Sequence, residues 1–253
     1  MRKTHAIALG FLLASLAAMT ARPAGSADTK AADALFAQRE DPKKLEAAVK
    51  AYEDAGAFAQ ATRACLARLE LHGDLKDDGQ KEPWVDRGLK DGAKALRIPD
   101  PDDVIDGLAK LARPDAEALF YFAALYGRKI ELCWKVKQFG MAKKFRRMAE
   151  RAAELDGTVA HGGPHRMLGN FHHDAPGLVG GDSARVRPEL DKAVEVAPKY
   201  AESRVMRAKL ADSPAEKKAD LEAALAAPDD AVPDMIPEQR AAKKEARALL
   251  DAK

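Results

Sequence analysis

Apolar residues recur along most of the chain at the spacing of a helix face. Leu45, Ala48, Val49 and Tyr52 lie three or four positions apart, and the same spacing returns between residues 58 and 69. Residues at these intervals share one side of an α-helix. We find no runs of alternating apolar and polar residues that would demand a β-sheet. The pattern therefore predicts a chain built from amphipathic helices.

Capping residues indicate where several of these helices begin. Asp41-Pro42 offers an N-cap followed by proline at the first helical position, and Ser213-Pro214 repeats that arrangement. Pro237 is expected to open the last helix. These signals, together with abundant alanine, favour an all-α protein.

Other residues are expected to interrupt helices. After a polar loop over 74–82, Pro83 is predicted to open a helix. The helix that starts at Pro114 has an apolar face that can extend as far as Phe139, and Gly140 is predicted to end this helix. Residues 157–181 are crowded with glycine and proline, which predicts a Gly-rich hairpin segment.

The chain is weakly similar to itself. In each similar segment an alanine-rich helix ends, a short turn follows and a new helix begins; the segments are 150–160, 191–201 and 222–228. This is the logic of tetratricopeptide-type hairpins, whose usual period is about 34 residues. We therefore predict about 10 to 12 helices that form irregular tetratricopeptide-like hairpins, stacked into one compact solenoid domain over residues 28–253.

The N-terminus resembles a secretory signal. Arg2 and Lys3 precede an apolar stretch over 6–19, and Gly25 and Ala27 are small residues where a signal peptidase cuts. We predict a signal peptide over 1–27 and an exported, periplasmic mature protein; a retained membrane anchor is the alternative. The sequence near the cleavage point contains no cysteine, so a lipid anchor is not expected.

Charge and motifs narrow the function. With 42 basic and 40 acidic residues the chain lacks the excess of positive charge that nucleic-acid binding requires. Nucleophile elbows, phosphate loops and paired carboxylates are not evident, so we expect no enzyme, no cofactor and no catalytic residue. Cys65 and Cys133 either form a disulfide in an oxidising compartment or are two buried thiols.

Histidines and glycines supply the candidate binding chemistry. His161 and His165 have the spacing of helical zinc ligands, but Gly162-Gly163-Pro164 between them prevents a continuous helix, so we predict no metal site. The glycines ahead of His165 and Arg166 either cradle an anion at a helix N-terminus or only permit a tight turn.

A second glycine pair offers the same alternatives. Gly180-Gly181-Asp182 either faces the first pair across the hairpin, or the glycines form a turn and Asp182 or Ser183 caps the next helix. An aromatic-rich helix also carries Tyr121, Phe122, Tyr126 and Trp134. Most of these side chains are expected in the core, and one or two are candidates to line a groove for an apolar ligand.

Four ordered segments resemble the T-component family of TRAP-type transporters, which are tetratricopeptide-like exported proteins. The segments are 34–53, 118–128, 162–200 and 225–238. Within the third, Gly162-Gly-Pro-His-Arg166 followed by Gly180-Gly-Asp182 is the most specific match. These residues, Gly162, Gly163, His165, Arg166, Gly180, Gly181 and Asp182, are therefore the predicted ligand- or partner-binding positions.

The resemblance implies an accessory role in solute uptake. Family members work beside an extracytoplasmic substrate-binding protein and a permease, and are thought to help hand over an organic or hydrophobic ligand. Residues 72–112 fit the family poorly and are expected to be an insertion or an atypical hairpin. Pro188 falls where the pattern expects the interior of a helix, which should kink or start late.

Two other functions remain open from the sequence. Degenerate repeats equally suit a generic protein-interaction scaffold of the cell envelope. A metal-binding module that uses the histidines is the third hypothesis. In each case the repeats can also assemble through their exposed ends into a homo-oligomer.

Overall fold

The computed structural model describes residues 28–133 and 135–252. This part of the chain contains α-helices and short 3₁₀ turns, and no strand. The helices are α1 Lys30–Phe36, α2 Pro42–Asp54, α3 Phe58–Leu71, α4 Asp78–Ala95, α5 Val104–Gly107, α6 Ala116–Leu132, α7 Lys135–Asp156, α8 Val159–Asp174, α9 Ser183–Val196, α10 Ala201–Lys209, α11 Pro214–Ala226 and α12 Ile236–Asp251. The predicted signal peptide and Trp134 lie outside the described residues.

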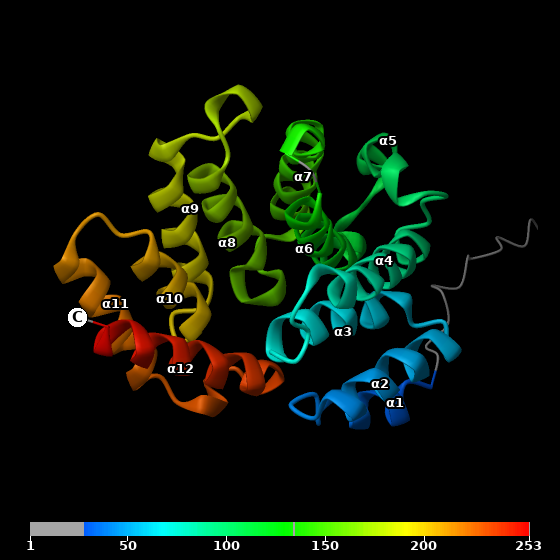
Figure 1. The fold of residues 1–253 in the computed structure, drawn as a ribbon, viewed down its shortest axis with the longest axis horizontal. Coiled ribbons are helices and arrows are strands. Elements are labelled where there is room, and N and C mark those ends of the chain that lie inside the picture. The colour runs from blue at the N-terminus through cyan, green and yellow to red at the C-terminus, as the bar shows by residue number, and fades with distance from the viewer. Residues whose placement is uncertain (1–27, 134, 253) are drawn as a thin grey trace, which may run out of the picture.

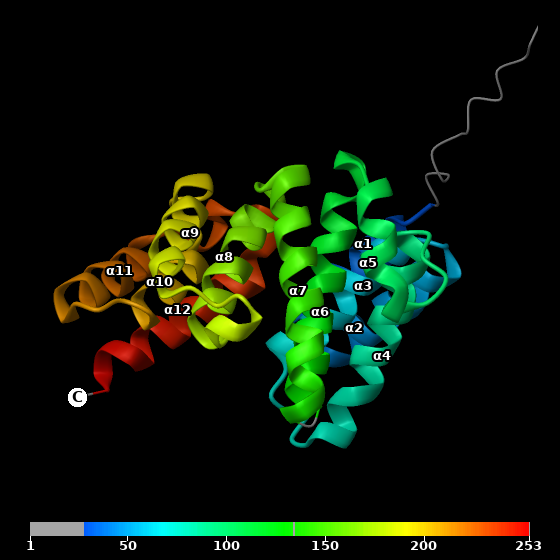
Figure 2. The same ribbon diagram turned by 90° about the horizontal axis from the view of Figure 1, so that it is seen from above.

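Each long helix packs against the next, which confirms the predicted all-α stack of hairpins. The array runs from α1 and α2 at one end, through α6 and α7 in the middle, to α10 and α11 at the other (Figure 2). Helix α12 then starts beside α3 and runs back along α10 and α11 (Figure 1). Within the described residues no helix is long and apolar enough to cross a membrane.

Three apolar clusters stabilise the array, and the two larger ones each join several helices. The largest one joins α1 through α8 around fully buried side chains such as Leu45, Phe122 and Tyr126. The second one lies among α10, α11 and α12 and is rich in alanine, for example Ala208 and Ala246. Small side chains let two helix backbones approach closely, which explains why alanine marks the hairpins in the sequence.

Helix caps follow the sequence at several positions. The Asp41 carboxylate accepts hydrogen bonds from the backbone N–H groups of Lys43 and Lys44, as its place before Pro42 predicted. The Asp182 carboxylate accepts from the N–H of Ala184 and caps α9. Both bonds satisfy donors that the first turn of a helix leaves free.

Two prolines lie inside helices. Helix α4 begins at Asp78, so the predicted start at Pro83 is wrong, and α9 begins at Ser183, so the late start that was one of the two outcomes expected for Pro188 is not observed. Each proline removes the donor that would pair with the carbonyl four residues earlier. Those carbonyls belong to Gly79 and Ala184, which are exposed residues near the helix start, where water can take the place of the missing N–H.

The predicted break at Gly140 is also wrong. The helix ends before Cys133 instead, and Gly140 lies inside α7, on its exposed face. Helix α6 therefore ends at Leu132 and does not extend to Phe139. The apolar face of α7, with Met148 and Ala149 fully buried, holds the helix together across a residue of low helix propensity.

The two cysteines are free thiols in this structure. Cys65 is buried on α3, and burial raises the pKa of its thiol. Cys133 is half-buried after α6. Of the two alternatives, the observed arrangement is therefore two separate thiols.

Candidate functional site

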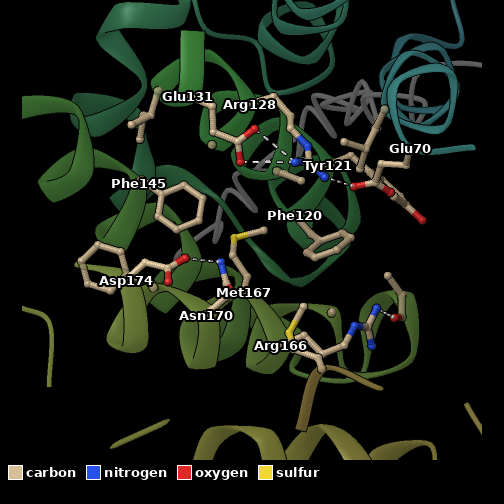
Figure 3. A pocket seen from close by; sticks show the side chains of 18 of the residues that line it. Glu70, Phe120, Tyr121, Arg128, Glu131, Phe145, Arg166, Met167, Asn170 and Asp174 are labelled. Carbon is tan, nitrogen blue, oxygen red and sulfur yellow. Dashed lines mark hydrogen bonds and ion pairs between the residues drawn. The ribbon is translucent and has the colours of Figure 1, made fainter. Parts of the chain in front are cut away.

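A cavity of about 830 Å³ lies between the two halves of the helical array, α1 through α7 and α8 through α12. Its walls come from α3, α6, α7, α8 and α10, from the segment that links α8 to α9, and from the start of α12 with the 3₁₀ turn before it. Figure 3 shows Phe120, Phe145 and Met167 facing the same space, with Arg128 and Glu131 at its upper edge. Ligand cavities in proteins commonly measure about 300 to 1,000 Å³, so this one can hold a small organic molecule.

Aromatic and aliphatic side chains form most of the wall. The rings of Phe145 on α7 and Phe171 on α8 lie 5.9 Å apart between centroids. Phe120 on α6 and Met167 on α8 complete this side. These residues belong to the apolar helix faces that pack the helices together. Where the two halves of the array separate, the same apolar faces line the cavity.

Ion pairs border the cavity. The Arg128 guanidinium donates to Glu70 at 3.1 Å and to Glu131 at 3.2 Å. The Glu70 side chain is 38% exposed, yet the protein atoms around its carboxylate displace water and raise its pKa, and the positive charge of Arg128 opposes that rise. A second cavity of about 600 Å³ adjoins the first, and Glu70, Arg128 and Glu131 line both.

Arg63 reaches the cavity wall from α3. Its guanidinium lies over the rings of Phe36 and Tyr121, at 5.1 and 5.7 Å from their centroids. Its nearest carboxylate oxygen is on Asp234, at 3.6 Å. Stacking on aromatic faces holds the side chain in place, while the ion pair is long.

Arg166, a predicted site residue, lines the cavity but uses most of its donors internally. Its guanidinium donates to the carbonyl oxygens of Ala160 and His161 at 2.9 and 2.7 Å. It also donates to the Ser203 hydroxyl at 3.1 Å and lies 4.8 Å from the centroid of the Tyr200 ring. Arg166 therefore fastens the non-helical turn over residues 160–162, which interrupts α8 near its start.

That turn has an unusual backbone. Ala160, His161 and Gly162 all have positive φ, at 47°, 55° and 82°. A Cβ on Gly162 would meet the backbone of Ala193 at 3.0 Å, and a Cβ on Gly163 would meet the Phe120 ring at 2.5 Å. Both glycines thus allow close packing, and Gly163 also lines the cavity.

The histidines point to different partners. The Nε2 atom of His161 lies 3.0 Å from Asp234, whereas Nδ1 of His165 lies 2.8 Å from Glu189. Burial raises the pKa of Glu189, but the hydrogen bonds from His165 and Lys192 outweigh it and leave that pKa below its usual value. Among the described residues no cluster of three potential ligands could hold a metal ion.

The second predicted group, Gly180, Gly181 and Asp182, lies outside the cavity wall. Gly180 has φ of 99° and leaves room for the Arg146 guanidinium, and Gly181 packs against the carbonyl of Ala175. With Asp182 capping α9, all three residues shape a turn. Of the seven predicted positions, the structure thus brings Gly163 and Arg166 to the cavity.

Sequence reasoning missed most of the wall. Phe120, Phe145 and Phe171 come from three helices and have the spacing of ordinary core residues. Tyr121, named as a groove candidate, does line the cavity, whereas Phe122 and Tyr126 are buried in the core. Arg63 and Arg128 carry no sequence signal that sets them apart from the other arginines of the chain.

One known protein family matches most of the chain. A search of curated proteins finds no match. The family model of the TRAP transporter T-component matches residues 83–253, which include α6, α7, α8, α10 and α12 of the cavity wall. That match spans more than half of the sequence and implies an accessory role in TRAP transport. The chain therefore belongs to the TRAP transporter T-component family.

Proposed function

We propose that this protein is a periplasmic accessory component of a TRAP-type uptake system that binds a substrate-binding protein and an organic ligand. The cavity between the two halves is the observation that carries the proposal. The family assignment supplies the transport context, and the predicted signal peptide supports export.

The chemistry of the wall favours a ligand with a largely apolar body. Phe120, Phe145, Met167 and Phe171 offer it aromatic and thioether surface. Enclosing such a ligand removes apolar area from water, which contributes about 25 cal/mol per Å². Polar groups at the edges, such as Asn170, would orient it.

The experiment is co-purification of the protein from periplasm, followed by mass spectrometry of proteins and small molecules. We expect a substrate-binding protein in the eluate, together with a retained organic molecule. Ala124→Trp fills the cavity from α6 and should abolish retention of that molecule. Ala219→Trp adds the same side chain on the exposed side of α11 and should leave retention unchanged.

The outcomes separate the two functions left open by the sequence. Recovery of envelope proteins without any substrate-binding protein would favour the generic scaffold. Equal retention of the small molecule by both tryptophan variants would mean that the cavity is not its binding site.

A further inference from the structure

Helix α7 begins with a strongly basic stretch. Residues 135–149 contain six basic side chains and no acidic one, whereas the whole chain has 42 basic and 40 acidic residues. Lys144 donates to the carbonyl of Asp102, and Arg146 lies 3.8 Å from Glu150. Among the described residues Lys137, Lys143 and Arg147 have no such partner, and all three are exposed. Their charge is therefore available to a partner.

Part of this charge forms one row. Phe139, Lys143 and Arg147 follow each other at intervals of four residues, so they lie along the same side of the helix. The opposite side of α7, including Met148 and Ala152, is fully buried. The eight rises of about 1.5 Å between Phe139 and Arg147 give the row a length of about 12 Å.

Two large exposed apolar side chains lie on α7 and on the turn that packs against it. Phe139 is 47% exposed, and Leu178 is 81% exposed on the 3₁₀ turn Gly177–Val179, which packs on α7. Large exposed apolar side chains beside arginine are typical of the centre of a protein interface. Phe139 also lines the cavity, as do Pro176, directly before that turn, and Val179 at its end.

We propose that Lys137, Phe139, Lys143, Arg147 and Leu178, here named the α7 surface, dock an acidic face of the substrate-binding protein. This inference rests on the proposed function. The unpaired positive charges attract and orient a negative face, and Phe139 and Leu178 anchor it. A partner seated here would cover the edge of the cavity, so a ligand would pass between the proteins with little exposure to water.

An anionic membrane fits this surface less well than a protein does. Asp106 lies on α5, which packs on α7, and Lys144 of α7 donates to the carbonyl of Asp102. Asp100 and Asp103 are close to them in the chain, and all four aspartates are exposed. A flat anionic bilayer would be repelled by these carboxylates as it approached the lysines. A folded partner can place its acidic residues opposite the basic row alone.

Binding measurements on purified proteins test the proposal. The exported chain would be titrated against each substrate-binding protein of the organism's TRAP systems, at low and high salt. We expect the triple variant Lys137→Glu, Lys143→Glu, Arg147→Glu to weaken association roughly tenfold or more and to flatten the salt dependence. Phe139→Ser should weaken it at both salt concentrations.

A control with the same change in charge is available away from α7. Lys43→Glu, Lys44→Glu, Lys244→Glu alters three exposed lysines on α2 and α12 and should leave the Kd within about twofold of the parent protein. Circular dichroism would verify that each variant is folded.

The outcomes distinguish the inference from the function beneath it. If the parent protein binds and the α7 variants bind equally well, the docking surface is wrong and the proposed function stands. If the parent protein binds none of the substrate-binding proteins, the proposed function fails and the inference fails with it. A third outcome would identify a membrane surface instead. In that case the parent protein binds vesicles of phosphatidylcholine and phosphatidylglycerol but no substrate-binding protein, and only the α7 variants lose vesicle binding.

Discussion

The Arg39 guanidinium donates two hydrogen bonds to the Glu238 carboxylate, at 2.6 and 2.8 Å, across a sequence separation of 199 residues. The same guanidinium donates to the carbonyl of Asp234 at 2.6 Å. Arg39 is 4% exposed, so this pair is almost removed from water. It joins the turn between α1 and α2 to the start of α12, and Glu238 also lines the cavity.

We expect Arg39→Ala to destabilise the fold by about 3 kcal/mol, because it leaves the partly buried carboxylate of Glu238 without its partner. Urea unfolding followed by circular dichroism would measure the change. Arg240→Ala is the matched control, since Arg240 pairs with Glu40 where both side chains are more than half exposed. Its effect should stay below about 1 kcal/mol, and equal effects of the two variants would contradict the role of Arg39.

Gly162→Ala should destabilise the protein by about 1 to 3 kcal/mol, because Gly162 has positive φ and its α-carbon faces the backbone of Ala193. Gly140→Ala should do the opposite. Gly140 lies inside α7 with open space around its α-carbon, so alanine gains helix propensity of up to about 1 kcal/mol. Chemical denaturation of both variants checks the predicted opposite signs.

His172 predicts a dependence of stability on pH. Its side chain is 2% exposed, it packs edge-on against the Phe171 ring, and neither ring nitrogen has a hydrogen-bond partner among the described residues. Burial lowers the pKa of His172 below its usual value of 6.5. As the pH falls below about 6.5, the unfolded chain therefore takes up the proton first, and the folded state loses stability.

The test compares His172→Phe with the parent protein between about pH 7 and pH 5. The free energy of unfolding should fall more steeply with acid in the parent protein than in this variant. His173→Phe changes the exposed neighbour and should keep the parent slope. Parallel slopes for all three proteins would show that His172 does not titrate differently on folding.

Arg128→Met should raise the pKa of Glu70 further, since the variant removes the positive charge that opposes the effect of burial. Carboxyl-carbon NMR titration of Glu70 measures this pKa directly. Lys129→Met is the control on the same helix, because Lys129 pairs with the exposed Asp86. An unchanged titration of Glu70 in Arg128→Met would mean that the pair is not formed in solution.

The sequence by itself determined the fold class and the family. The spacing of Leu45, Val49 and Tyr52 and the cap at Asp41 are local signals, so they indicate a helix whatever surrounds it. The order of short motifs around Gly162 and Gly180 was enough to indicate the T-component family, which the family match confirms.

Helix boundaries were predicted less well, because they depend on burial as much as on propensity. Pro83 and Gly140 were predicted to start and to end a helix, and Pro188 to kink one or delay its start, yet each lies inside a helix. In each case the residue stands at the exposed side or near the start, where its cost is small, and the buried face of the helix outweighs it. Neighbouring residues alone do not reveal which face will be buried.

Only the tertiary structure decided where the cavity lies. Phe120, Phe145 and Phe171 have the same helical spacing whether they face a packed core or a cavity. Arg39 and Glu238 meet because the start of α12 lies beside α3, close to the turn between α1 and α2, and nothing in the two local sequences predicts that contact. Helix preference depends on short stretches of sequence, whereas the shape of a site depends on the distances between packed helices.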